Sequence, residues 1–263
     1  MAGRKNKKIV LSLYDYTGEA LRPYAEAGYT CYAYDIQHSK HVNLSEFARG
    51  SATLGTTEIF KGGGAIHYVH ADLHDFKTLL WIENEFNGQN VVLGMAWPVC
   101  TDMAVSGAAH FKAKAEHDPE FQTKAVTHAM RCADLFEALG CPYMIENPVS
   151  VLATKWRKPD HSFHPYQYGE YIPEDQAAHP RWPEYIAPHD AYTKKTCLWT
   201  GGGYNMPPKL PTCKPSGYST QHKMLGGKSK KTKDIRSATP RGFAIANFLA
   251  NQSSETNRSG LRT

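Results

Sequence analysis

The segment KIVLSLYDYTG, residues 8–18, gives the first indication of the fold. Its apolar part, residues 8–14, is long enough for a buried strand and is followed directly by Asp15. The next segment, residues 19–27, carries a helical pattern that stops at Gly28. A strand that leads directly into a helix is typical of the first unit of a parallel α/β sheet.

The same alternation of strand and helix continues through the first half of the chain. Further strands are expected at residues 31–36, 66–71, 91–97 and 141–145, and helices at residues 75–86 and 120–139. Since parallel strands need crossover connections, this order predicts an α/β fold with a mostly parallel, Rossmann-like sheet.

The composition changes after residue 150. Histidine, proline, tryptophan and tyrosine crowd residues 155–192, which indicates an irregular insertion. Beyond them we expect a strand at residues 195–200, loops over 201–233 and a last helix over 239–251. The expected organisation is a domain over residues 1–150, an insertion over 151–235, a returning helix over 236–252 and a disordered tail over 253–263.

The composition is that of an ordinary globular protein. Of the 263 residues, 41% are hydrophobic and 21% are charged, so the chain can bury a sizeable core. The sequence holds no apolar run of the length that a membrane helix needs, and its N-terminus does not fit a signal peptide. The six cysteines include no CxxC pair. We therefore expect a cytoplasmic protein with free thiols.

Most of the net charge of +5 comes from one segment, residues 221–242. This segment holds seven lysines and arginines and a single aspartate, whereas the rest of the chain is close to neutral. Clustered positive charge suits a polyanionic partner, because phosphate binding needs several cations together. The alternative is a solvated loop or tail without a partner.

Polar side chains follow each predicted strand at its carboxyl end. In an open α/β sheet these ends lie along one edge, where ligands bind. A carboxylate after the second strand suits a ribose diol, and one after the third suits an adenine amino group, which together indicate a nucleoside-containing cofactor. Either aspartate alone could instead cap a helix or a turn. In strand order, the residues are Asp15, Thr17 and Gly18; Asp35; Asp72; Pro98 and Cys100; and Glu146 and Asn147.

Cys100 and Glu146 are the pair from which we infer chemistry. A lone cysteine is more often an inert, packed side chain. A thiolate and a carboxyl group at adjacent strand ends can instead hold a flat ring, with sulfur attacking a carbon while the carboxylic acid binds a ring nitrogen.

These motifs resemble those of the cytosine-C5 DNA methyltransferase family, and more closely its short phage-encoded branch. The likeness covers residues 8–150 and the closing helix at 239–251. The chain departs from the family in keeping only Gly18 in the first motif, with Thr101 in place of glutamine and Pro148 in place of valine. The motifs are LSLYDYTG at residues 11–18, YDI at 34–36, ADL at 71–73, WPVC at 97–100 with Gly107, and IENP at 145–148.

One motif of the family is missing. We find no Gln-x-Arg-x-Arg strand, whose arginine in the family steadies the reacting base. The nearest candidates are Lys194 and Lys195. An exposed edge strand guarded by lysines would explain the same two residues.

The resemblance implies a class I fold that binds S-adenosylmethionine and methylates C5 of a cytosine flipped out of double-stranded DNA. It implies that Cys100 adds to C6 of the ring while Glu146 binds or protonates N3, so that C5 becomes nucleophilic. It assigns Cys100, Glu146, Asn147 and Lys195 to catalysis, and Tyr14, Asp15, Thr17, Gly18, Asp35, Ile36, Asp72, Leu73 and Pro98 to the cofactor. The residues expected to contact DNA are Lys194, Lys228, Lys230, Lys231, Lys233 and Arg236.

We further expect a monomer with a short recognition sequence, in a bacterial or phage-infected cell. The resemblance to the family alone implies that methylation there guards phage DNA. No metal site is expected, because Cys197 and Cys213 lie sixteen residues apart and His161 and His164 lie far upstream.

Two other functions remain open. One is C5 modification of cytosine in RNA or in a free nucleotide, or transfer of a different group, since the basic segment does not distinguish DNA from RNA. The other is a catalytically silent DNA-binding or decoy protein, suggested by the incomplete glycine motif and the missing arginine. Retention of both Cys100 and Glu146 argues against the silent protein.

Overall fold

The computed structural model describes residues 7–38, 53–216, 219–226 and 229–252. The predictions for Lys228 and for the tail at residues 253–263 lie outside the described residues. Among the described residues, none of the helices combines the length and the apolar character that crossing a membrane requires.

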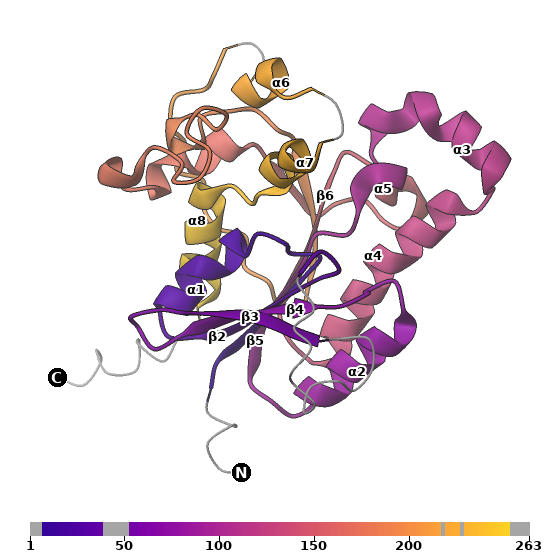
Figure 1. Ribbon diagram of the computed structural model, residues 1–263, viewed down its shortest axis with the longest axis horizontal. Coiled ribbons are helices and arrows are strands. Elements are labelled where there is room, and N and C mark those ends of the chain that lie inside the picture. Colours follow the sequence, from indigo (N-terminus) through magenta and orange to yellow (C-terminus); the bar gives the residue numbers. More distant parts are fainter. Residues whose placement is uncertain (1–6, 39–52, 217–218, 227–228, 253–263) are drawn as a thin grey trace.

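The described part of the chain forms one eight-stranded sheet, with the order β3-β4-β2-β1-β5-β6-β8-β7 (Figure 1). The five strands β4, β2, β1, β5 and β6 run parallel, β3 pairs antiparallel with β4, and β8 pairs antiparallel with both β6 and β7. The predicted α/β fold with a mostly parallel sheet is therefore confirmed. The strands are β1 (Ile9–Leu13), β2 (Thr30–Asp35), β3 (Thr53–Ile59), β4 (Ala65–His70), β5 (Val91–Ala96), β6 (Tyr143–Pro148), β7 (His161–Phe163) and β8 (Thr196–Gly201).

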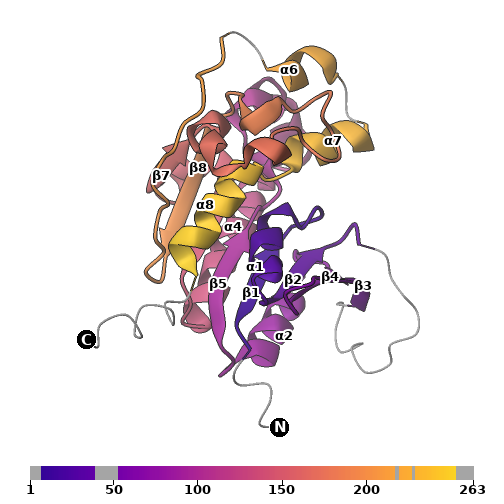
Figure 2. The ribbon, with the colours of Figure 1, turned by 90° about the vertical axis from the view of Figure 1, so that its left-hand side faces the viewer.

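Helices cover both faces of the sheet. Figures 1 and 2 show α1 and α8 on one face and α2 and α4 on the other. The helices are α1 (Arg22–Glu26), α2 (Phe76–Phe86), α3 (Phe111–His117), α4 (Phe121–Ala138), α5 (Leu152–Lys155), α6 (Thr220–Met224), α7 (Lys230–Ser237) and α8 (Arg241–Asn251).

The central strand β1 shows why the fold is layered in this way. Its five residues are all buried, with Leu11 and Leu13 in the core beneath α2 and α4, and Val10 in the core beneath α1 and α8. Close packing continues at Gly94 of β5, where an added Cβ would lie 2.3 Å from the ring of Phe136 on α4. β1 is also the strand at which the sheet order changes direction, and in such sheets the crevice beyond the carboxyl ends at this point binds ligands.

Several elements differ from the sequence prediction. The edge strand β3 was not predicted, because its sequence TLGTTEI is mostly polar and contains a glycine. The short strand β7 and the helix α7 also lie in stretches expected to be irregular or loop-rich. Residues 19–27 form a 3-10 turn followed by the short helix α1, with Pro23 in its first turn, instead of one continuous helix.

Strands β7 and β8 extend the main sheet, although both lie within the stretch expected to be an insertion. Glu146 of β6 is paired with Leu198 of β8, so the strand end that carries Glu146 is covered on its outer side. Helices α6 and α7 lie above the carboxyl ends of the parallel strands (Figure 2).

Candidate active site

Cys100 lies just beyond the carboxyl end of β5, at the start of the short 3-10 helix Cys100–Asp102. The side chain is exposed, and the loop that carries it is held to the neighbouring strand β6. Nδ2 of the buried Asn147 donates a hydrogen bond to the carbonyl of Pro98 at 2.9 Å. Asn147, predicted to be catalytic, is therefore placed to fix the loop that presents Cys100.

Glu146 is the residue before Asn147 and points toward the same region. Its Oε1 atom is buried and has no hydrogen-bond partner among the described residues. Burial raises the pKa of Glu146, and the nearby ammonium group of Lys194 opposes this effect. A buried carboxyl oxygen without a partner is costly, so its presence indicates a place for a polar group of a ligand.

The electrostatics join Cys100 to Glu146. The pKa of Cys100 is raised by partial desolvation of its sulfur and by the negative charge of Glu146, whereas the positive charge of Lys194 lowers it. The surroundings of Cys100 therefore do not favour its thiolate form. A group that neutralises the charge of Glu146 would lower the pKa of Cys100 and so favour the thiolate.

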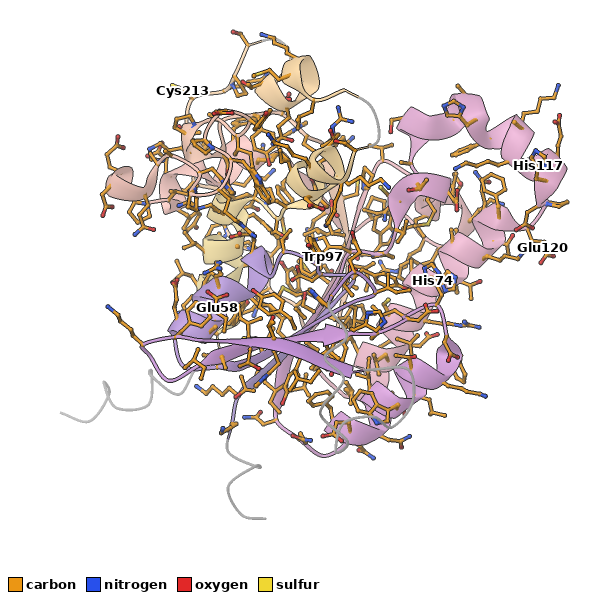
Figure 3. The ribbon with its side chains drawn as sticks, in the orientation of Figure 1. Glu58, His74, Trp97, His117, Glu120 and Cys213 are labelled. Atoms are coloured by element: carbon orange, nitrogen blue, oxygen red, sulfur yellow. The ribbon has the colours of Figure 1, made fainter. Side chains whose placement is uncertain are left out.

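Glu146 lines a small cavity, partly open to solvent, whose enclosed space is about 10 Å³, enough for one water molecule. The rings of Trp97, Phe163 and Phe243 form much of its wall, and the Phe163 and Phe243 rings are stacked with centroids 4.3 Å apart. Figure 3 shows Trp97 near the centre of the molecule, between the region of α6 and α7 and that of α3 and α4. The aromatic walls, the carboxyl group and the amine offer the contacts that a flat, polar heterocycle uses, and such a ring enters only if the walls move apart.

Lys194, and not Lys195, lies in this cavity. Lys194 and Thr196 both line it, as expected for residues two apart in an extended segment, and Lys194 Nζ donates to the carbonyl of Arg236 at 3.0 Å. Lys195 is placed instead near His164, whose pKa is lowered by burial and by the charges of Lys195 and of two further lysines, Lys209 and Lys214. The sequence leaves both lysines as candidates for the missing arginine, with Lys195 assigned to catalysis and Lys194 to DNA contact, and the structure places Lys194 near Glu146.

Asp15 shapes the loop after β1. Its carboxylate accepts hydrogen bonds from Ser12 Oγ at 2.6 Å and from the backbone N–H of Gly18 at 2.7 Å. Burial raises the pKa of Asp15, and these two hydrogen bonds oppose that rise. Gly18 has a φ of 68°, and an added Cβ would lie 2.6 Å from the hydroxyl of Tyr68, so a side chain there would be strained and would displace the Tyr68 ring.

The ends of β1 and β4 are tied together by Tyr14, which has a left-handed φ of 57°. Its hydroxyl donates to the carbonyl of Leu73 at 3.2 Å, and burial raises its pKa. Left-handed backbone is uncommon for a bulky residue and is often found at functional sites.

Asp35 and Asp72 lie at the ends of β2 and β4, as predicted. One oxygen of Asp35 accepts the N–H of Gln37 at 2.7 Å, and one oxygen of Asp72 accepts the N–H of His74 at 2.9 Å. Asp35 is buried, whereas the next residue, Ile36, exposes its apolar side chain. Each carboxylate therefore stabilises a turn, as the alternative interpretation expected, while standing at the edge where ligands bind.

The basic segment folds in part as α7. Lys230 lies over the ring of Tyr16, 3.9 Å from its centroid, and Lys231 donates to the hydroxyl of Tyr185 at 3.0 Å. Lys233 is exposed, whereas Arg236 donates to the carbonyl of Leu225 at 2.6 Å and so supports the local fold.

The cysteines and histidines considered for zinc lie on β7, on β8 and in the loops that follow each of these strands. Cys197 is buried in β8, whereas Cys213 is exposed and lies far from Trp97 in Figure 3. The described residues contain no group of three or more histidine, cysteine or acidic side chains arranged to hold a metal ion.

Comparisons with known proteins give resemblances at the level of structure alone. No family model matches the sequence, and no curated protein matches it. Among solved structures, the chain is similar to a candidate DNA modification methyltransferase encoded within a prophage, from E. coli, at 14% sequence identity and a TM-score of 0.40. The match covers 74% of this chain and 46% of that one, so the chain spans less than half the length of the protein it resembles.

Proposed function

We propose that the protein is an S-adenosylmethionine-dependent DNA methyltransferase that acts on C5 of cytosine. The observation that carries the proposal is the pairing of Cys100 with Glu146 beside an aromatic-walled cavity. In that cavity the buried Oε1 of Glu146 has no partner among the described residues.

Glu146 is suited to bind the ring nitrogen N3 of cytosine. Because burial raises its pKa, the carboxyl group holds a proton more readily than an exposed glutamate does. A protonated carboxyl donates to N3 and withdraws electrons from the ring as charge develops. A protonated Glu146 also lacks the negative charge that raises the pKa of Cys100.

Cys100 is the nucleophile in this proposal. Its thiolate forms a bond to C6, and the proton from Glu146 moves to N3, which makes C5 nucleophilic. S-adenosylmethionine, when bound, supplies an electrophilic methyl group. Once C5 carries the methyl group, the C5 proton passes to water, the electron pair of the C5–H bond expels the Cys100 thiolate from C6, and the N3 proton returns to Glu146, which restores the ring and the free enzyme.

The residues at the carboxyl ends of β1, β2 and β4 fit a nucleoside-containing cofactor. Carboxylates stand at the ends of β2 and β4, and the left-handed Gly18 closes the loop after β1 without a side chain. In the proposal, Asp35 and Asp72 accept hydrogen bonds from the ribose and adenine, and Tyr14, Ile36, Leu73 and Pro98 provide the apolar contacts. Asp15 and Thr17 shape the loop.

The exposed lysines above the sheet are the proposed DNA contacts. They form two groups, Lys230, Lys231 and Lys233 on α7 and Lys195, Lys209 and Lys214 around His164. Such groups give affinity for the phosphate backbone that falls with salt. The base would have to leave the duplex to reach Glu146, because a stacked base cannot enter a cavity.

The test is incubation of the purified protein with isotope-labelled S-adenosylmethionine and mixed-sequence duplex DNA, followed by mass spectrometry of the nucleosides. We expect labelled 5-methyl-2′-deoxycytidine with wild type and with Cys213→Ala, the matched exposed cysteine, and none with Cys100→Ala. Label only on RNA, only on free nucleotides, or on none of these substrates would contradict the proposal.

A further inference from the structure

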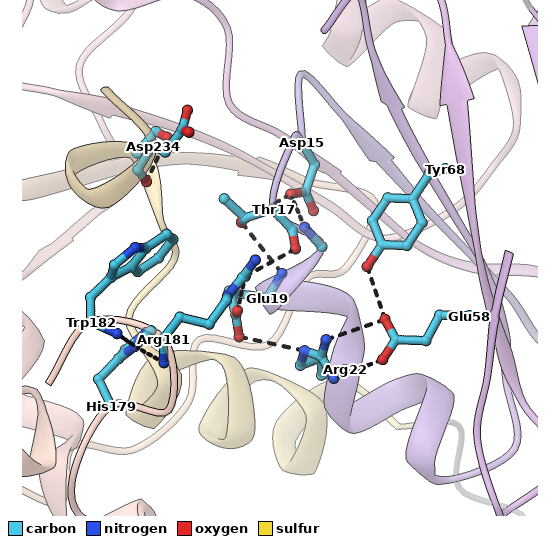
Figure 4. Close-up of polar contacts among 12 residues, drawn as sticks. Asp15, Thr17, Glu19, Arg22, Glu58, Tyr68, His179, Arg181, Trp182 and Asp234 are labelled. Carbon is cyan, nitrogen blue, oxygen red and sulfur yellow. Dashed lines mark hydrogen bonds and ion pairs between the residues drawn. The ribbon is translucent and has the colours of Figure 1, made fainter. Parts of the chain in front are cut away.

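An arginine from the stretch between β7 and β8 reaches the loop after β1. Nη2 of Arg181 donates to the carbonyl of Thr17 at 3.3 Å and also pairs with the carboxylate of Glu19 (Figure 4). These residues are more than 160 positions apart in the chain. The contact therefore joins the region of the proposed DNA contacts to the loop proposed for the cofactor.

Glu19 is a buried carboxylate, with only 4% of its side chain exposed. Glu19 also pairs with Arg22, whose Nε lies 3.7 Å from the Glu19 carboxylate. Nη1 of Arg22 in turn pairs with Glu58 Oε1 at 3.1 Å. The hydroxyl of Tyr68 donates to Glu58 at 3.2 Å, and the same hydroxyl lies against Gly18. A buried carboxylate is costly without cations, so both arginines are needed to keep this network in place.

Arg181 itself is held in position before it reaches Glu19. Its guanidinium lies 4.8 Å from the ring centroid of Trp182. The backbone N–H groups of Arg181 and Trp182 donate to Nδ1 of His179 at 3.2 and 3.1 Å, and His179 is buried. Because the turn and Trp182 already restrict the Arg181 side chain, it loses little conformational entropy when it pairs with Glu19.

A second cation touches the same loop. Lys230 of α7 lies over Tyr16, and the Tyr16 ring is stacked on His38, whose Nε2 lies 3.0 Å from the carbonyl of Asp15. Residues 15–18 are thus contacted by cations from two segments on the DNA-facing side of the sheet.

We propose that Arg181 is a positioning residue for the cofactor: it fixes the Thr17 carbonyl and Glu19, so that the stretch after β7 completes the cofactor loop. This inference rests on the proposed function. Its consequence is that cofactor affinity depends on a residue outside residues 1–150.

The chain offers a closely matched control in Arg157. Like Arg181, it pairs with a carboxylate (Asp160, 2.6 Å), donates to a backbone carbonyl (Thr200, 2.9 Å) and lies over a tryptophan (Trp156, 4.9 Å). Its partners lie on and before β8 and include none of residues 15–19. Arg157→Gln therefore removes an equivalent set of contacts away from the cofactor loop.

The experiment is calorimetric titration of S-adenosylhomocysteine into wild type, Arg181→Gln, Arg181→Lys and Arg157→Gln, with thermal unfolding of each variant without ligand. We expect Arg181→Gln to weaken binding at least tenfold, Arg181→Lys to weaken it less, and Arg157→Gln to leave it unchanged. In methylation assays, Arg181→Gln should raise the KM for the cofactor while kcat at saturation changes less than threefold.

Equal affinity in wild type and Arg181→Gln, or an equal loss in Arg157→Gln, would overturn the inference while leaving the proposed function intact. If wild type does not bind the cofactor at all, the proposed function fails and the inference fails with it. If Arg181→Gln does not fold, Arg181→Lys decides. This variant keeps the charge but lacks the length and the planar head group of arginine, so unchanged cofactor affinity in it would contradict the inference.

Discussion

Glu146 combines two properties at the scale of a single residue, an unpartnered buried oxygen and a raised pKa. Both are costs to the folded protein that a bound base would remove. Catalytic groups often carry such costs, because the environment that perturbs them is the one that makes them reactive. The same residue raises the pKa of Cys100, so the reactivity of the thiol depends on what occupies the cavity.

Glu146→Gln is expected to abolish methylation while making Cys100 more reactive in the absence of substrate. Removing the negative charge lowers the pKa of Cys100, so more thiolate is present at pH 8. The loss in kcat should be about 10²–10⁴-fold, the usual contribution of a positioned acid or base. Alkylation by iodoacetamide, mapped by mass spectrometry with the exposed Cys213 as internal reference, measures the reactivity. Slower alkylation of Cys100 in this variant would contradict the account.

Lys194 and Lys195 are adjacent in sequence, yet they should differ in effect. Lys194→Gln removes the amine beside Glu146 and should lower kcat by more than tenfold with little change in DNA affinity. Lys195→Gln should weaken DNA binding and reduce the slope of log affinity against log salt by about 1, with kcat retained. Measurements of kinetics and of DNA binding at several salt concentrations test both variants. A loss of kcat in Lys195→Gln and a loss of DNA affinity in Lys194→Gln would contradict this account and support the assignment made from the sequence.

At the scale of elements, a buried aspartate joins α8 to the turn before β8. Asp190 accepts the N–H of Gly242, in the first turn of α8, at 3.0 Å, and the residue has a left-handed φ of 49°. Burial raises its pKa to about 6. The junction is therefore most stable when this carboxyl group is protonated.

The free energy of unfolding should fall as the pH rises from about 4 to about 6, because the folded state holds the Asp190 proton over that interval and the unfolded state does not. Asp190→Asn keeps an acceptor for Gly242 and has no charge to bury. It is expected to flatten this part of the stability curve and to be more stable than wild type above pH 6. Chemical denaturation of both proteins between pH 4 and pH 7 gives the free energy of unfolding at each pH. If this free energy depends on pH in the same way in both proteins, Asp190 is not the group responsible.

At the scale of the whole molecule, the strands β1, β2, β4, β5 and β6 could be predicted because they are short apolar runs, each ending at a polar residue or a turn. β3 could not, since an edge strand needs no apolar pattern, and α7 could not, since it buries only Thr232 and Ile235. The position of Lys194 depends on the pairing of β8 with β6, which a single sequence does not reveal. The contact of Arg181 with Glu19 depends on tertiary folding in the same way.

The central claim concerns the whole molecule, namely that the sheet edge, the aromatic cavity and the basic surface act together on one cytosine. Its most direct test is a mixed-sequence DNA duplex with fluorine at C5 of every cytosine, incubated with the protein and S-adenosylmethionine. Fluorine at C5 cannot leave as the proton does, so the bond between Cys100 and C6 should persist. We predict a protein–DNA complex that survives denaturation and maps to Cys100, present in Cys213→Ala and absent in Cys100→Ala. A complex through another cysteine, or none from protein that binds both cofactor and DNA, would contradict the account.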